Sequence, residues 1–395
     1  MLKQAAPEAL KKIEDFFLFL TLLFLPTQLG LHFWPKFSYI YSLKIDYLSP
    51  VVYFWDILVM LLFILWIFGK PRINKLALNL MLLFLFTQAL SLLGTANLGA
   101  GLVRLEQYII AGFFGIYLSS LQNKKAIYLP LLLGVLGESL IAILQFIHGA
   151  TLGLWILGER SFSITTPGIA KFDIFGMQFL RPYGTFPHPN VLAGYMLIVS
   201  SILYQVSWGR QKIFKIALLF SGISIFLTMS RTAILYGFIL LVFLRKKFLI
   251  LLVLLLTPVL FIRFSSILNF DNLALLRREE LIGSAWQLFL KSPLYGIGLN
   301  NFIPALANNL ISGPSRFLQP AHNIFFLTLA ETGIIGLTGL IIMIGYPIVK
   351  KANLLPWLII IFLGLFDHYF LTLPQGYRLL FLVWGLSLSR VKIVS

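Results

Sequence analysis

His188 stands where the sequence would hold an imidazole rigidly. It belongs to the stretch Arg181-Pro-Tyr-Gly-Thr-Phe-Pro-His-Pro-Asn190, which leads directly into an apolar segment. Proline locks φ and has no N–H group, so the two flanking prolines fix the backbone at His188. Asn190 is suited to the N-cap of the helix that follows. The alternative to a functional role is a purely structural corner between loop and helix.

His322 lies in a similar place, within Gln319-Pro-Ala-His-Asn323 just before another apolar segment. A neutral imidazole can accept a proton near pH 7, because its unperturbed pKa is about 6.5. A histidine positioned in this way could assist a hydroxyl group as it attacks, so His322 and His188 are candidate general bases. All the histidines map to the same side of the apolar segments, and we assign His32 and His148 to the membrane interface. The full set is His32, His148, His188, His322 and His368.

Several arginines lie on the same side as these histidines. Arg231 stands in the tight turn Thr228-Met-Ser-Arg-Thr-Ala233, away from the other basic clusters. The planar guanidinium group binds phosphate oxygens in pairs, so such a set suits a diphosphate at the membrane surface. For the arginine pair in the longer loop, the alternative is pairing with Glu279, Glu280 or lipid headgroups. The other members of the set are Arg104, Arg181, Arg277 and Arg278.

Polar residues near the ends of other apolar segments complete the candidate site. Glu331 lies inside a predicted membrane segment, where an ionisable residue is costly and therefore a functional candidate. Asn323 follows His322, and Asp367 and His368 stand beside a segment end. The chain has no cysteine, DxD or HExxH pattern, so we expect no metal. It has no P-loop or glycine-rich dinucleotide fingerprint either, so we expect no cofactor.

The composition is that of a membrane protein. Of the 395 residues, 59% are hydrophobic and 11% are charged, against about 25% charged in an ordinary soluble domain. The net charge of +17 comes from short clusters between apolar segments, which indicates anionic lipid as the partner and not nucleic acid. We predict an all-α fold in a single transmembrane domain, residues 1–395, with about twelve membrane-spanning helices. They are expected near 15–33, 50–69, 75–93, 102–121, 126–149, 190–207, 213–228, 232–244, 248–264, 323–347, 354–371 and 376–390.

Basic clusters set the orientation of these helices. With twelve spans every cluster falls on one side, and cytoplasmic loops attract Lys and Arg, so both termini are expected in the cytoplasm. The first apolar run is expected to be retained, because more spans follow it. The two long loops, about 150–189 and 265–322, then lie outside, and helical spacing from Leu273 to Phe289 predicts an interfacial helix. The clusters are Lys11 with Lys12, Lys70 with Arg72 and Lys75, Lys124 with Lys125, Arg210 with Lys212, Arg245 to Lys247, Lys350 with Lys351, and Arg390 with Lys392.

An ordered set of motifs makes the sequence resemble the O-antigen ligase and polymerase family. The resemblance covers mainly residues 100–370, and the earlier segments match only in hydrophobicity. The motifs are Gly184-Thr-Phe-Pro-His-Pro-Asn-Val-Leu-Ala-Gly-Tyr195, Ser230-Arg-Thr-Ala233, Ser292-Pro-Leu-Tyr-Gly-Ile-Gly-Leu-Asn-Asn-Phe302, Ala321-His-Asn323 and Glu331-Thr-Gly333.

This resemblance implies a GT-C-type glycosyltransferase of the inner membrane. Such an enzyme takes a glycan from an undecaprenyl-diphosphate carrier and passes it to a hydroxyl of a glycan, lipid or protein acceptor on the outer or periplasmic face. His322 matches the family's catalytic histidine, and Arg231 matches an arginine that engages the diphosphate. Arg277 and Arg278 lie where the family has an arginine before a tryptophan, here Trp286. The predicted catalytic residues are His322 and Arg231, and the predicted substrate-binding residues are Arg181, His188, Asn190, Arg277, Arg278, Asn323, Glu331, Asp367 and His368.

Two alternatives to a ligase stay open at this point. A polymerase joins repeat units from the same kind of donor, and the sequence does not separate it from a ligase. A transporter or flippase of lipid-linked sugars could also have twelve spans, with intramembrane residues such as Asp56, Glu138 and Gln145 on its path. Transport sites lie near the midplane between repeated halves, whereas the polar features here gather at one face.

The predicted topology can be tested with reporters. Fusions after Lys70, Lys247 or Lys351 should report a cytoplasmic location, because basic clusters stay inside. Insertions near Gly168 or Ser312 should report an external one. A cytoplasmic reporter at Ser312 would contradict the placement of all the candidate site residues.

Overall fold

The chain is mostly helical. A computed structural model describes residues 2–389 apart from 175, 206–211, 244–260, 262–272 and 309–317. Its helices are α1 (Leu2–Leu23), α2 (Phe54–Phe68), α3 (Lys75–Leu90), α4 (Leu98–Ser119), α5 (Tyr128–His148), α6 (Pro189–Tyr204), α7 (Lys212–Leu227), α8 (Arg231–Phe243), α11 (Leu273–Lys291), α12 (Phe302–Asn308), α13 (Ile324–Val349), α14 (Leu354–Gly364), α15 (Tyr369–Thr372) and α16 (Pro374–Leu388).

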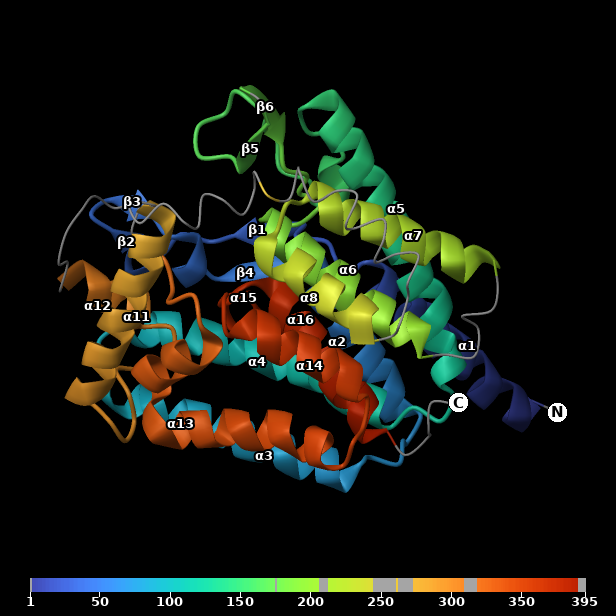
Figure 1. Cartoon of the computed structure of the whole chain (residues 1–395). Helices are drawn as coiled ribbons and strands as arrows, with labels where there is room; N and C mark the ends of the chain where they lie inside the picture. Colours follow the sequence, from blue (N-terminus) through green and yellow to red (C-terminus); the bar gives the residue numbers. More distant parts are fainter. Residues whose placement is uncertain are drawn as a thin grey trace.

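Three short antiparallel strand pairs correct the expectation of an all-α fold. They lie together at one end of the molecule (Figure 1). Short two-stranded sheets are marginal on their own, so they depend on packing against helices. Phe172 and Phe179 illustrate this packing, since both rings stack on Phe146 of α5. The pairs are β1 (Gly30–His32) with β4 (Val51–Tyr53), β2 (Tyr39–Ile40) with β3 (Leu43–Lys44), and β5 (Lys171–Ile174) with β6 (Met177–Leu180).

Helices occupy most of the predicted spans, but few are long and apolar enough to cross a membrane by themselves. Three of the described helices meet both criteria, namely Lys75–Gly94, Lys124–His148 and Ile324–Val349. The others are shorter or carry charged side chains, so the count of twelve spans stays a prediction. The first predicted span, 15–33, is wrong in extent, because α1 ends at Leu23 and a strand begins at Gly30. The span 248–264, the residues Lys247 and Ser312, and the basic residues Arg210, Arg245, Arg390 and Lys392 lie outside the described residues.

Several basic clusters lie together at the end of the molecule opposite the strand pairs. The Asn74 amide, beside the cluster at 70–75, donates to the carbonyl of Leu388 at 2.9 Å, so the turn before α3 meets the end of α16. The Tyr117 hydroxyl donates to Glu14 at 2.8 Å, which brings the first part of α1 to the end of α4. Both chain ends are marked on this side in Figure 1. The side of the membrane on which they lie stays a prediction.

Helices α4 and α16 pack closely near their C-terminal ends, and residues near their N-terminal ends line the site described below. A Cβ on Gly385 would meet the carbonyl of Gly115, and a Cβ on Gly115 would meet the ring of Trp384. Only glycine permits this approach of the two backbones. The fully buried rings of Trp55, Trp357 and Trp384 fill the core between these helices and their neighbours.

Helix α13 is broken at Gly333, and a loop fills the break. Gly333 has φ 63° and ψ −165°, a conformation that essentially only glycine adopts. The two N–H groups just after the break donate to the carbonyls of Pro293 and Leu294, and the two carbonyls just before it accept from Ile297 and Gly298. The loop thus replaces helix hydrogen bonds that the break removes, as backbone in an apolar environment requires. The motifs Ser292–Phe302 and Glu331–Gly333, both part of the family resemblance, therefore form one structural unit.

Replacing Gly333 by Ala should destabilise the protein. A Cβ at this position would overlap the Leu294 carbonyl, and the backbone conformation is strained for any other residue, by about 1–3 kcal/mol. We expect a lower melting temperature in detergent. Gly345→Ala in the same helix is the control, since its Cβ would meet nothing within 4 Å. Equal melting temperatures of the two variants would contradict a structural need for the break.

Candidate active site

A cavity of about 560 Å³ lies at the end of the molecule that holds the strand pairs. Its lining comes from the segment between α1 and α2, the outer part of α4, the start of α6, and the segments before α13 and α15. Four of the five histidines line it, which are His32, His188, His322 and His368. Residues that are far apart in the sequence therefore meet at one place.

His188, and not Asn190, is the N-cap residue of α6, which corrects the prediction. Its Nδ1 atom accepts the N–H of Asn190 at 3.1 Å, and Pro189 takes the first helical position. Burial, together with the charge of Arg181, lowers the pKa of His188 to about 3, so the ring is neutral. Because the Nδ1 lone pair is occupied, the proton stands on Nε2. His188 is therefore a hydrogen-bond donor and has no spare lone pair for a proton.

Asn190 connects an arginine to a carboxylate. Arg181 Nη2 donates to Asn190 Oδ1 at 2.9 Å, and Asn190 Nδ2 donates to Asp367 Oδ2 at 3.2 Å. The arginine is anchored in turn, because its Nε donates to the carbonyl of Thr228 at 2.6 Å. This chain of bonds fixes which way the amide points. It joins the first long loop, the turn before α8 and the segment before α15.

His368 is held in one orientation next to Asp367. The backbone N–H of His368 donates to Asp367 Oδ1 at 2.8 Å, and the ring Nε2 lies 4.0 Å from the same oxygen. The Thr372 hydroxyl lies 2.6 Å from His368 Nδ1 and donates to the His368 carbonyl at 3.2 Å. The Nδ1 atom of His368 is therefore occupied by Thr372. Burial lowers the pKa of His368 to about 3.

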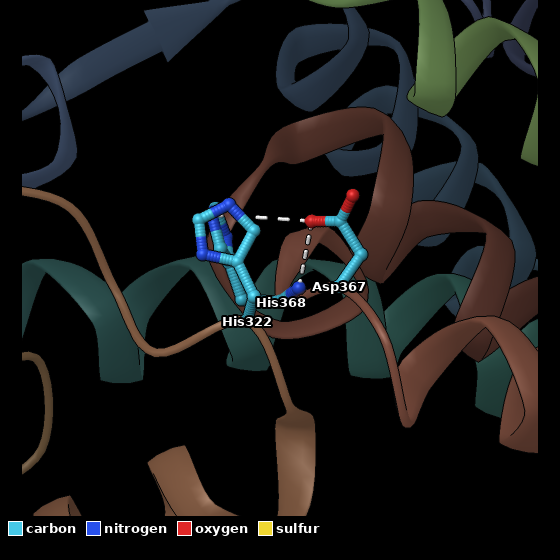
Figure 2. A group of neighbouring side chains, drawn as sticks. All are labelled: His322, Asp367 and His368. Carbon is cyan, nitrogen blue, oxygen red and sulfur yellow. Dashed lines mark hydrogen bonds and ion pairs between the residues drawn. The ribbon is translucent and has the colours of Figure 1, made fainter. Parts of the chain in front are cut away.

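His322 lies against His368, lines the cavity and has a ring nitrogen without a described partner. The ring centroids are 5.0 Å apart with planes at 79°, and Figure 2 shows both rings beside Asp367. The Nδ1 atom of His322 is buried and has no hydrogen-bond partner among the described residues. Burial lowers the pKa of His322, the Asp367 carboxylate opposes this effect, and Arg278 reinforces it. His322 is thus a neutral imidazole with an available nitrogen, as a general base must be.

The same three side chains could also hold a metal ion. One ligand atom each from His322, Asp367 and His368 lies within 4.8 Å of the other two. Two imidazoles and a carboxylate suit zinc or iron. Both Asp367 oxygens, however, already accept N–H groups, so a metal would compete with those bonds. The absence of a metal stays a prediction.

The predicted arginines divide between the cavity and its surroundings. Arg278 of α11 lines the cavity, and α11 itself matches the helix predicted from Leu273 to Phe289. Arg104 also lines it and donates to the Thr372 carbonyl at 2.9 Å and to Asn300 at 3.3 Å. Arg231, at the start of α8, and Arg277 are not among the lining residues.

Asn323 and Glu331 support the site from outside the cavity. Asn323 is the N-cap of α13, where its Oδ1 accepts two backbone N–H groups, and its amide donates to the carbonyl of Leu365 at 3.1 Å. Glu331 is half-buried and accepts the N–H of Phe302 at 3.2 Å. These bonds hold the helix starts next to the cavity.

The segment between α1 and α2 contributes a wall that sequence reasoning missed. Most of it, residues 34–49, lies between the predicted spans 15–33 and 50–69 and was given no role, and His32 was expected at the membrane interface. The available signal was the density of aromatic and polar residues between Pro26 and Phe54. The lining residues missed in this way are His32, Trp34, Asp46, Tyr47 and Tyr53, together with Arg160 from the first long loop.

The apolar helices and the histidine- and arginine-lined cavity at one end define the class, a helical membrane protein with a polar site. Residues 216–341 match the family model described as O-antigen ligase. The match confirms the resemblance seen in the sequence for this part of the chain. The match supports glycan transfer of the ligase or polymerase kind and hence a membrane enzyme. No curated protein matches the chain.

Replacing Asn190 by Ala should loosen the site. The change removes the hydrogen bonds that Asn190 makes to Asp367 and Arg181, and a buried polar group that loses its partner costs about 1–3 kcal/mol. We expect a lower melting temperature in detergent. Asn79→Ala is the control, because Asn79 is exposed on α3. An unchanged melting temperature for Asn190→Ala would mean that this chain of bonds does not stabilise the fold.

Proposed function

We propose that the protein transfers a glycan from an undecaprenyl-diphosphate carrier to an acceptor hydroxyl, on the outer face of the inner membrane and without a metal. The observation that carries this proposal is the free, buried Nδ1 of His322 in a cavity that Arg278 also lines. The region matched by the O-antigen ligase model includes both residues and supports glycan transfer of the ligase or polymerase kind.

In the proposed reaction His322 acts as the general base. The acceptor oxygen forms a bond to the anomeric carbon of the donor sugar while its proton passes to the imidazole. The bond between that carbon and the diphosphate oxygen breaks, and the diphosphate leaves with the electron pair. The donor is already activated by its leaving group, so neither a nucleotide nor a redox cofactor is required.

The diphosphate is proposed to meet arginine side chains. Arg278 lies in the cavity close enough to act on the pKa of His322, so a phosphate bound there would be next to the base. Arg231 is the second proposed contact, because α8 begins at this residue and its charge and that of Arg278 influence each other. Two guanidinium groups would neutralise the charge that develops as the diphosphate departs.

His322 is preferred to the other histidines for a structural reason. His188 uses its Nδ1 lone pair to accept a backbone N–H, and the Nδ1 of His368 is bonded to Thr372. His322 has an unpartnered ring nitrogen and faces Arg278 as well as Asp367. Asp367 is proposed as a positioning residue, because its negative charge favours protonation of His322.

Replacing His322 by Ala should lower the transfer rate by at least about a hundredfold, since general-base assistance is typically of that size. The measurement is mass analysis of products from purified protein, a polyprenyl-diphosphate glycan and its acceptor, all in EDTA. His148→Ala is the control, since His148 ends α5 away from the cavity lining. Retention of more than about a tenth of the wild-type rate would remove His322 from the base role.

The pH dependence of kcat/KM should follow the pKa of His322. The neutral ring is the active form, so the rate should fall as pH drops through a pKa that burial sets below 6.5. Asp367→Asn removes the charge that raises this pKa and should move the acid limb to lower pH. Arg278→Gln removes a charge that lowers it and should move the limb to higher pH. Shifts in the same direction would mean that another group controls the rate.

A further inference from the structure

The charges around the cavity separate it into two ends. Arg278 acts on His322 and His188, whereas Asp46 and Arg160 act on His32. The first end is the one proposed to hold the diphosphate. We use the name amide end for the part of the lining that comprises Gln28, His32, Asp46, Tyr47, Gln107 and Arg160.

The amide end reaches the candidate base through a row of rings. The ring of Tyr47 meets His368 edge-on, with centroids 5.8 Å apart, and His368 meets His322 in the same way at 5.0 Å. Tyr47 is fixed by its backbone, since its carbonyl accepts from the Asn300 amide at 3.0 Å. A molecule in contact with Tyr47 would therefore be separated from His322, the candidate base, by the rings of Tyr47 and His368.

Two buried amide atoms at this end have no hydrogen-bond partner among the described residues. They are Nε2 of Gln28, a donor, and Oε1 of Gln107, an acceptor. Gln107 is 7% exposed and lies one helical turn below Arg104, so its side chain belongs to the floor of the cavity. Buried polar atoms are nearly always satisfied, and an orphaned donor and acceptor in a cavity indicate a ligand that supplies both.

A sugar has this chemistry. Each hydroxyl both donates and accepts a hydrogen bond, and amide, carboxylate and phenol side chains are suitable partners for it. A diphosphate offers only acceptors, so it cannot satisfy the acceptor Oε1 of Gln107. The amide end thus differs in chemistry from the end near Arg278.

We propose that the amide end binds the terminal sugar of the acceptor and delivers its hydroxyl to His322. This inference rests on the proposed function for the identity of the acceptor. It assigns acceptor recognition largely to the segment between α1 and α2 and to α4, both outside the matched domain at 216–341. The donor would be recognised from the opposite end, so the two substrates would meet at His322.

Direct binding tests the amide end without any turnover. The probe is the water-soluble oligosaccharide released by mild acid from the envelope glycolipids of the source cells, titrated calorimetrically into the full-length protein in detergent. The wild type should bind it, and Gln107→Leu should bind about three- to tenfold more weakly, as loss of one neutral hydrogen bond predicts. Gln28→Leu should do the same. Gln178→Leu, on the exposed strand β6, should bind as the wild type does.

Kinetics then separate this proposal from the proposed function. With a radiolabelled polyprenyl-diphosphate glycan as donor and envelope glycolipid as acceptor, Gln107→Leu should raise the KM of the acceptor and leave the KM of the donor unchanged. A raised donor KM would overturn the assignment, as would equal oligosaccharide binding by folded wild type and variant. If oligosaccharide binds at this end but no glycan is transferred, the amide end stands and the proposed reaction falls.

Discussion

The geometry of the site depends on one largely buried carboxylate, whose side chain is 14% exposed. Asp367 accepts hydrogen bonds from the Asn190 side chain and from the backbone of His368, and these partners come from different parts of the chain. A buried carboxylate that loses such partners is strongly destabilising, so the start of α6 and the segment before α15 must stay in register. Arg181 extends the constraint to the turn before α8. Local changes at any of these positions therefore act on the whole site.

The carboxylate also sets the electrostatics of the histidines. Burial alone would raise the pKa of Asp367, but the positive charge of Arg278 helps to hold it below its usual value. The group is thus an anion among imidazoles that burial keeps neutral. An anion beside His322 makes this ring a stronger base than burial alone would allow. The arrangement combines a dry environment with a ring that can still take up a proton.

The scaffold places these groups by satisfying backbone hydrogen bonds in an apolar environment. At Gly333 helix α13 stops for one residue, and the loop after α11 supplies the missing donors and acceptors. Arg104 links α4 to the Thr372 carbonyl and to Asn300, which ties this loop to the floor of the cavity. The polar network is confined to one end of the bundle, and apolar packing such as that of α4 against α16 holds the remainder together.

The sequence by itself determined the class of the protein and much of its site. Apolar runs separated by basic clusters predicted a helical membrane protein, because bilayer thickness and loop charge constrain such a chain locally. Proline-bounded histidines and ordered motifs predicted the family, and His188, His322 and His368 do line one cavity. These properties are readable because they depend on short stretches of residues.

Only the tertiary structure decided which of these residues cap helices, which bind the Asp367 carboxylate and which line the cavity. His188 takes the N-cap position that was expected for Asn190, and Asn190 instead donates to Asp367. The N-cap depends on which side chain reaches a backbone N–H in three dimensions. Asp367 became central because residues far apart in the sequence converge on it. The wall from the segment between α1 and α2 was not predicted, because residues 34–49 lie between the predicted spans and only the fold brings them beside the histidines. Long-range contacts, and not local composition, determine whether a polar side chain caps a helix, anchors a carboxylate or faces a cavity.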